Sequence, residues 1–545
     1  TLALCLERTI TLPAFAQHEV PVQPLPEGEV RRLLEHALPG ARVTPALTRE
    51  ALASSGGLSG RLCQVLAQGL AAGTDMSRPG GFAALGAAHA ADLSTLPESA
   101  RDLVELLAAA GGELMPLAAQ AALGSSTALA EAQRLLVAAG LCTRSGEHLC
   151  LRADLTAALR GTLHGARLIA LAARLPENEL DGRARAHLWL ARQQPQRASL
   201  AFEEEASRLR AQGQPEQAAL CARDGLHSLG DLDPASRDKL SIALADALRA
   251  QGRYAEAQAA LCDLLSPRAH ALRGELFRLA GDCIAARTTA EQALDGASDQ
   301  PVAAEAEALL ARLAYDEGDL SRAERLAESA QARAAANPQA EPSALRAAEV
   351  LVLVALHRAE RERAASFLAA ALPLSRQARL RVCEARLTSL WAELARQDGD
   401  SHTAAKRFAV AFELADAAGE QHASAAFLHN VGVQRLDAGE LGPAIAALRE
   451  AARRLARLGR DADLARALYN LAHAAQFVGA DDVALSSALR AHQSAERAGD
   501  ASTLFSAQCL EAELRLKLGD RKAVTALLGR PRDLTRLPPA VAATV

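Results

Sequence analysis

Three stretches of the chain repeat one pattern that decides the fold: GDLSRAERLAESA (318–330), GELGPAIAALREAARRL (439–455) and GADDVALSSALRAHQSA (479–495). Each begins with a Gly that ends one helical pattern, and an Ala follows five residues later inside the next. Gly ends a helix readily because it adopts a left-handed backbone conformation at little cost. The pattern therefore predicts pairs of helices joined by a tight turn at the Gly.

The turn recurs along the chain, and its spacing is constant among the last four members. Its members are Gly213, Gly252, Gly281, Gly318, the degenerate Ala359, and then Gly399, Gly439, Gly479 and Gly519, the last four 40 residues apart. A small residue stands seven positions before most of these turns, as Ala392 and Gly432 do, which lets two helices approach closely. One such pair cannot bury its apolar face alone, so the pairs are expected to stack into a solenoid.

Composition agrees with a helical chain. The 545 residues are 50% hydrophobic but only 3% aromatic, which argues against a sandwich, a barrel or a large doubly wound sheet. The net charge of −5 argues against a strongly basic binder of polyanions. Nine scattered cysteines without a CxxC pair indicate neither a disulfide framework nor a zinc site, and a cytoplasmic location is expected. The apolar runs are too short for a membrane span, so no membrane partner is expected.

A different pattern occupies the middle of the chain. Helical patterns at 93–111, 115–123 and 125–142 are followed by an alternating stretch, LCTRSGEHLCLR (141–152), which is typical of a small hairpin. Three helices and a hairpin predict a winged-helix-like domain over 76–163. Its third helix carries only Glu131 and Arg134 as charges, whereas DNA binding needs clustered basic residues. We therefore expect a structural or autoinhibitory role and no direct DNA binding.

The first zone carries a family resemblance. HEVPVQPLPEGEVRRLLEHAL (18–38) and LTREALASSGGLSGRLCQVLAQGL (47–70) resemble the lid that follows the core strands of STAND-type, AAA+-related signalling ATPases. Gly57–Leu58–Ser59 stands where those proteins have Gly-Asn-Pro. The resemblance implies a core strand over TLALCLER (1–8), with Arg8 as a candidate nucleotide sensor. The repeats themselves resemble a long variant of the tetratricopeptide pattern.

The resemblance implies four parts in an all-α fold. These are the end and lid of an NTPase-type module without its core (1–75), the winged-helix-like domain (76–163), a right-handed α-solenoid of tetratricopeptide-like hairpins (164–530) and a tail (531–545). The chain has no GxxxxGK[ST] loop and no kinase signature, so we expect neither catalysis nor a cofactor in it. ATP would bind in a longer parent chain. Because the chain begins with Thr1, we expect an internal fragment or a processed product.

The function expected from this architecture is that of a regulatory arm of a bacterial signalling or transcription-regulating ATPase, which binds an effector or partner protein. Two alternatives stay open: a free-standing scaffold, and the C-terminal region of a multidomain serine/threonine kinase. No motif in the chain supports the hypothesis that it is an enzyme.

A partner site is expected on the first helices of the later repeats, since tetratricopeptide-like arrays line a concave groove with them. Alignment on the turn Gly puts ten residues there: Arg386, Glu393, Arg396, His429, Asn430, Arg466, Tyr469, Asn470, His473 and Gln476. Side-chain amides can hold an extended backbone, and a guanidinium can grip a carboxylate. The alternative is that the two Asn residues, at one repeat position, bond within their own hairpins. No metal site is expected.

Overall fold

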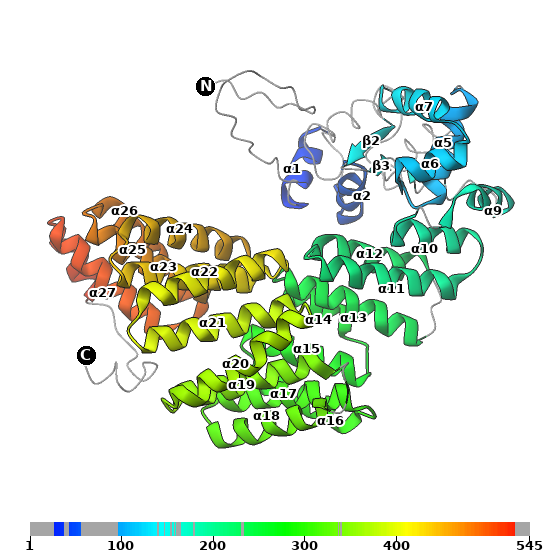
Figure 1. The fold of residues 1–545 in the computed structure, drawn as a ribbon. Helices are drawn as coiled ribbons and strands as arrows, with labels where there is room; N and C mark the ends of the chain where they lie inside the picture. Colours follow the sequence, from blue (N-terminus) through cyan, green and yellow to red (C-terminus); the bar gives the residue numbers. More distant parts are fainter. Residues whose placement is uncertain are drawn as a thin grey trace. The chain divides into compact units, whose positions relative to one another are not determined.

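The computed structural model describes residues 27–37, 43–55, 96–138, 141–145, 148–152, 155–156, 159, 165–177, 180–229, 234–335, 337 and 340–528. The expected strand with Arg8, the turn at 57–59 and the tail at 531–545 lie outside these residues. Contacts divide the chain into two compact units, residues 1–198 and 199–545, which Figure 1 shows in ribbon form. In the first zone, two helices pack on each other, α1 (Glu27–Ala37) and α2 (Pro45–Ser55).

The middle of unit 1 has the predicted winged-helix arrangement. Its elements in order are α5 (Glu98–Ala109), β1 (Glu113–Leu114), α6 (Pro116–Leu123), α7 (Ser126–Ala138), β2 (Cys142–Ser145) and β3 (His148–Leu151). The three strands form an antiparallel sheet in the order β1-β3-β2, with Arg144 opposite Leu149 in the hairpin. The short strand β1 adds an edge that the sequence pattern did not indicate.

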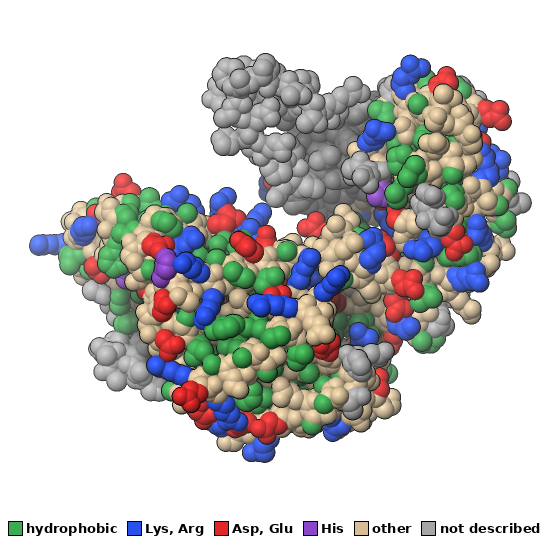
Figure 2. Space-filling view, in the orientation of Figure 1, with side chains coloured by type: hydrophobic (Ala, Val, Ile, Leu, Met, Phe, Trp, Pro, Cys, Tyr) green, Lys and Arg blue, Asp and Glu red, His purple; other side chains and the backbone are tan. Residues whose placement is uncertain are grey.

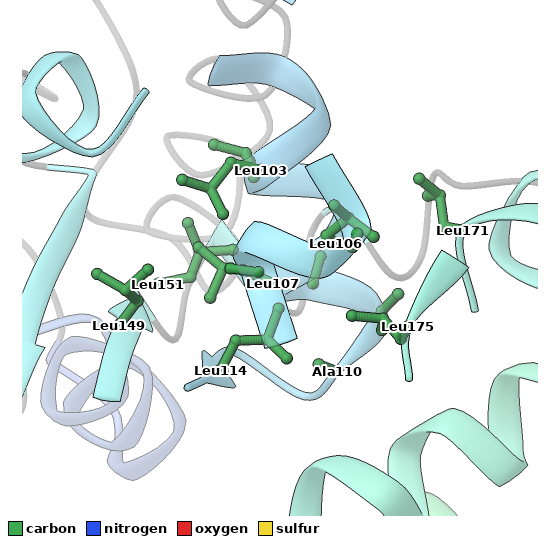
Figure 3. Close-up of a cluster of buried hydrophobic side chains, with 14 of the residues drawn as sticks. Leu103, Leu106, Leu107, Ala110, Leu114, Leu149, Leu151, Leu171 and Leu175 are labelled. Carbon is green, nitrogen blue, oxygen red and sulfur yellow. The ribbon is translucent and has the colours of Figure 1, made fainter. Parts of the chain in front are cut away.

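The core of this unit is built on α5. Figure 3 shows Leu103, Leu106 and Leu107 of α5, with side chains from the strands on one side and from the segment around 171–175 on the other. Leu171 and Leu175 belong to the same buried cluster, and they come from α9 (Gly165–Arg174) and the residue after it. The next helix, α10 (Gly182–Ala191), joins this cluster too. The sequence placed the start of the repeats at residue 164, but these two helices pack within unit 1.

Unit 2 is an array of antiparallel helix pairs, as predicted, without a strand among its described residues. The pairs are α11 (Pro195–Ala211) with α12 (Pro215–Ser228), α13 (Pro234–Ala250) with α14 (Tyr254–Leu261), α15 (Pro267–Ala280) with α16 (Cys283–Gly296), α17 (Gln300–Asp316) with α18 (Leu320–Ala335), α19 (Glu341–His357) with α20 (Arg361–Gln377), α21 (Arg381–Gln397) with α22 (Ser401–Ala417), α23 (Gln421–Asp437) with α24 (Leu441–Arg457), α25 (Asp461–Phe477) with α26 (Asp481–Ala498), and α27 (Ala501–Lys517) with α28 (Arg521–Leu528).

The turns have the backbone conformation that the repeat pattern predicted. Every turn Gly from Gly213 to Gly519 has a positive φ, and Ala359, the degenerate member, adopts the same left-handed conformation with φ of 58°. A second series, which the sequence analysis did not identify, joins each pair to the next: Gly419, Gly459 and Gly499 also have positive φ. The small residue before the turn is needed for close packing. A Cβ on Gly432 would lie 2.6 Å from Cγ of Leu448 on the paired helix.

The first helices of the pairs lie on the inside of the curve. Consecutive first helices, such as α15 and α17 or α17 and α19, pack directly on one another, more extensively than consecutive second helices do. The curve is tight enough to bring distant parts of unit 2 together. The α11–α12 turn, with Gly213 and Pro215, contacts the α22–α23 turn, with Ala417 and Gly419. We call this meeting of the two turns, together with the side chains that join them, the closing contact.

Gly213 and Gly399 offer a matched test of the closing contact. Both have a left-handed φ, of 78° and 80°, but a Cβ on Gly213 would clash with the carbonyl oxygen of Ala417, whereas one on Gly399 meets nothing within 4 Å. We expect Gly399→Ala to lower stability by about 1–2 kcal/mol, which is the penalty for a left-handed Ala. Gly213→Ala should cost about 1–3 kcal/mol more, because backbone atoms must move. Urea denaturation followed by circular dichroism measures both; equal losses would show that the turns do not touch in solution.

Candidate functional site: the inner face of the repeat array

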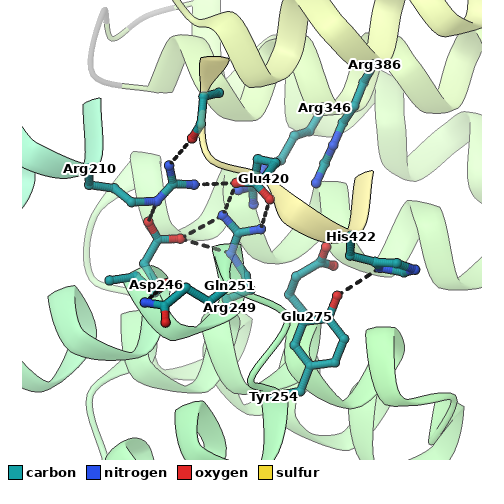
Figure 4. Close-up of polar contacts among 12 residues, drawn as sticks. Arg210, Asp246, Arg249, Gln251, Tyr254, Glu275, Arg346, Arg386, Glu420 and His422 are labelled. Atoms are coloured by element: carbon teal, nitrogen blue, oxygen red, sulfur yellow. Dashed lines mark hydrogen bonds and ion pairs between the residues drawn. The ribbon is translucent and has the colours of Figure 1, made fainter. Parts of the chain in front are cut away.

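Charged side chains of the first helices gather on the inner face of the array (Figure 4). Glu275 of α15, Arg346 and Glu349 of α19, and Arg386 of α21 border one small cavity of about 30 Å³. This is room for one water molecule and too little for a ligand. Burial raises the pKa of Glu349 despite the nearby Arg386 and Arg346. Burial would raise the pKa of Glu275 too, but the charge and hydrogen bond of Arg278, with the charges of Arg386 and Arg346, together lower it. This part of the face is thus filled by its own ion pairs.

The closing contact is held by buried charges. Arg249 of α13 donates two hydrogen bonds to the carboxylate of Glu420, at 2.8 and 3.1 Å, and the two side chains are only 7% and 6% exposed. Arg210 of α11 pairs with Glu420 as well and donates to the carbonyl oxygen of Ala418 at 2.9 Å. Asp246 accepts from both arginines at 2.9 Å. Burial alone would raise the pKa of Glu420, but the charges of Arg249 and Arg210 lower it.

A second set of contacts joins the same two parts of the array. The hydroxyl of Tyr254 lies 2.9 Å from Nδ1 of His422, and Nε2 of His422 lies 2.8 Å from Asp463 of α25. Arg460 stacks on the Tyr254 ring, 5.3 Å from its centroid, and donates to the carbonyl oxygen of Leu279 at 3.1 Å. Burial raises the pKa of Tyr254 to about 12, so the phenol stays protonated and can donate. The closing contact is therefore an extended polar interface within unit 2.

The ten residues predicted to bind a partner all lie on the first helices α21, α23 and α25. The structure joins most of them to neighbours. The pairs are His429 with Asn470 at 2.8 Å, Tyr469 with His473 at 2.9 Å, Arg396 with Glu393 at 2.8 Å, Gln476 with Glu513 at 2.8 Å, Arg466 with Asp463 at 2.9 Å and Arg386 with Glu349 at 3.8 Å. Asn430 makes no side-chain hydrogen bond with the described residues. Asn470 thus bonds to the neighbouring first helix, not within its own hairpin.

His429 is the most perturbed of these side chains. Burial and the charge of Arg466 lower its pKa to about 4, so the imidazole is neutral near pH 7. Burial also lowers the pKa of His473. Neutral imidazoles can both donate and accept hydrogen bonds, as amides do. We call the side chains of His429, Asn430, Arg466, Tyr469, Asn470, His473 and Gln476 the inner polar row.

Within the described part of the chain, no three His, Cys, Asp or Glu side chains are placed to hold a metal ion. Every described helix is too short or too polar to cross a bilayer. Arg210, Arg249 and Glu420 could not be predicted from the sequence, because no repeat spacing relates residues that meet across the closing contact. The only signal was the second series of turns, since Glu420 follows Gly419 directly.

No family model matches this chain, and no curated protein matches it. Among solved structures, the chain is similar to a signal transduction ATPase with numerous domains (STAND) that has a tetratricopeptide repeat sensor, from Pyrococcus horikoshii, at 13% identity and a TM-score of 0.44 over 95% of this chain and 73% of that one. It is also similar to a Rap protein complexed with competence and sporulation factor, at 13% identity and a TM-score of 0.41, over 60% of this chain and 99% of that one. A third similar structure is that of pilF of Pseudomonas aeruginosa, at 20% identity and a TM-score of 0.32, over 45% of this chain and 97% of that one. The first is of the type that the sequence resembles.

Glu420→Gln should destabilise the array by about 3 kcal/mol, because the buried guanidiniums of Arg249 and Arg210 would then share only the carboxylate of Asp246. Since the folded-state pKa of Glu420 is lowered, its stabilisation is present above the ordinary pKa of about 4.3 and is lost as the pH falls through the folded-state value. The stability difference between wild type and variant should thus shrink in acid. Urea denaturation at a series of pH values measures it.

The control for this variant is Asp481→Asn. Asp481 pairs with Lys517 at 2.8 Å, but these side chains are 24% and 52% exposed, so the loss should be below about 1 kcal/mol. Equal effects of the two substitutions would contradict the assignment of Glu420 to a buried closing pair.

His429 should titrate near pH 4 in an NMR titration of its ring signals, which His429→Asn assigns. Arg466→Ala should raise this pKa, because it removes a positive charge that disfavours the imidazolium. By linkage, the neutral His429 contributes stability above the unfolded-state pKa of about 6.5, and this contribution is lost as the pH falls from there to about 4. A ring that titrates near 6.5 in the wild type would show that His429 is not buried beside Arg466.

Proposed function

We propose that this chain is the regulatory and protein-interaction region of a bacterial signal-transduction or transcription-regulating ATPase. On this proposal, the inner polar row binds an extended segment of a partner or effector protein. The observation that carries the proposal is the row itself: amide, imidazole, phenol and guanidinium groups that follow one another on α23 and α25, on the inner face of a helical array.

Side chains of the inner face are more exposed on α25 than where ion pairs fill the face. From α13 to α21, carboxylates and guanidiniums fill it and leave a cavity of about 30 Å³. Further along, on α25, the side chain of Arg466 is 55% exposed. Phe477, next to Gln476 at the end of α25, is 68% exposed. A partner segment could therefore find both hydrogen-bonding groups and an apolar contact there.

The chemistry of the row suits a polypeptide. Side-chain amides donate to backbone C=O groups and accept from N–H groups, and Tyr469 offers a flat surface with few rotatable bonds. In the view of Figure 2, acidic and basic side chains are interspersed over the array, with hydrophobic ones between them. A nucleic acid would favour a surface on which basic side chains cluster without acidic ones. The distribution supports a protein partner rather than DNA.

Unit 1 favours a regulator over a free-standing scaffold, because a scaffold has no need of a winged-helix-like domain before its repeats. We place the chain in the cytoplasm, where thiols stay reduced; the described cysteines form no disulfide with one another. ATP would bind to a core in a longer parent, and this chain would relay partner binding to it without catalysing a reaction itself.

The test begins with a photoreactive phenylalanine analogue at Tyr469, which should crosslink the partner in bacterial cells. The same analogue at Ile284, an 83% exposed residue on the second helix α16, is the control and should not crosslink it. The crosslinked segment is then identified and made as a synthetic peptide for calorimetry.

Arg466→Ala with Asn470→Ala should weaken binding of that peptide by about ten-fold or more, since each lost hydrogen bond to a charged or amide group is worth about 1–2 kcal/mol. Arg490→Ala, at an exposed position on α26, should leave it unchanged. Full-strength binding by the double variant would refute the role of the inner polar row.

A further inference from the structure

A separate cleft of about 710 Å³ opens beside the closing contact, outside the inner polar row. One wall comes from α12 and the α13–α14 turn, and the other comes from the ends of α22 and α24 and the start of α23. Four guanidiniums line it: Arg223 and Arg253 on the first wall, and Arg454 and Arg457 on the second. Its volume is in the range of ordinary ligand sites.

The four arginines differ in how far they are neutralised. Arg253 donates two hydrogen bonds of 2.7 Å to Glu256, and Arg454 is paired with Glu450 at 3.0 Å and with Asp416. Carboxylates therefore hold these two in place. Arg223 and Arg457 keep unused hydrogen-bond donors.

Arg223 is half exposed, and its paired carboxylate is Glu256 at 3.9 Å, which Arg253 already occupies. Arg457 is exposed, and no ion pair joins it to any residue that the structure describes. Each wall of the cleft thus presents one guanidinium without a close carboxylate. A ligand with two separated negative groups could pair with both.

The remaining lining adds apolar and amide groups. Leu220 on α12 is 56% exposed at the wall of the cleft, beside Arg223 one turn along the helix. Gln421 contributes a side-chain amide, which can hold a peptide backbone. Two lining carboxylates, Glu216 and Asp416, would repel a continuous run of phosphates. An ion alone would leave Leu220 uncovered.

We propose that this cleft binds an acidic peptide segment of a partner protein, with its carboxylates on Arg223 and Arg457 and an apolar side chain over Leu220. The site is distinct from the inner polar row. Because its walls meet only where the array closes, such a peptide stabilises the closing contact. By linkage, a change that weakens the closing contact also lowers the affinity for the peptide.

The probe is a fluorescein-labelled peptide of glutamates with interspersed leucines, and its counterpart has glutamine in place of each glutamate. Fluorescence anisotropy with the full chain should show saturable binding of the glutamate peptide, weaker at high salt, and little binding of the glutamine peptide. Arg223→Glu with Arg457→Glu should weaken the affinity by about ten-fold or more, since two charge pairs are reversed. Arg449→Glu, an exposed position on α24 outside the cleft, should leave it unchanged.

Circular dichroism and thermal melting check that the variants fold. Arg466→Ala with Asn470→Ala should bind the glutamate peptide normally, so that failure of this site and failure of the inner polar row are told apart. The proposal is overturned if the glutamate peptide does not saturate, if the glutamine peptide binds equally well, or if the double charge reversal has no more effect than Arg449→Glu. Inorganic tripolyphosphate that binds as tightly as the peptide would also overturn it, in favour of a small-anion site.

Discussion

The buried pairing of Arg249 and Glu420 is the interaction on which the shape of the repeat array depends. A solenoid normally holds together through contacts between neighbouring repeats, so small changes at each interface accumulate along its length. Here a carboxylate from the α22–α23 turn inserts between Arg210 and Arg249, which come from the start of the array. A buried ion pair has a large desolvation cost and is weak support for stability. Its effect is specificity: one placement of Glu420 satisfies both guanidiniums, and that placement fixes the curvature.

The helix pairs could be predicted from the sequence because each turn has a local cause. A left-handed residue is needed at each turn, Gly supplies it most cheaply, and the regular spacing of Gly399, Gly439 and Gly479 identified the register of the helices. Even Ala359 has the same conformation in its place. The two-residue strand β1 and the packing of α9 on the winged helix have no such local cause. They depend on side chains, such as Leu114 and Leu171, that meet in a core assembled from distant segments.

The candidate site likewise has contacts that follow from the repeat period and contacts that do not. The turn Gly placed all ten predicted residues on the first helices, because it fixes which helix of a pair comes first. Pairings between adjacent repeats also follow the period in retrospect: His429 and Asn470 are 41 residues apart, one more than the repeat length, as are His422 and Asp463. The pairing of Arg249 with Glu420 spans 171 residues and matches no multiple of the period. Only the curvature of the array brings these two together.

The inner face has two chemically different parts. Where the closing contact and the charges of α15, α19 and α21 meet, guanidiniums and carboxylates neutralise one another and the space is full. Beyond α21 the face carries neutral imidazoles, amides and a phenol beside the guanidinium of Arg466, and their hydrogen-bonding capacity is only partly used by their neighbours. Neutral groups cost less to desolvate than charges do when a partner covers them. On the proposed function, a partner therefore binds the inner face where its groups are not taken up by ion pairs, whereas the second proposed site lies outside that face, beside the closing contact.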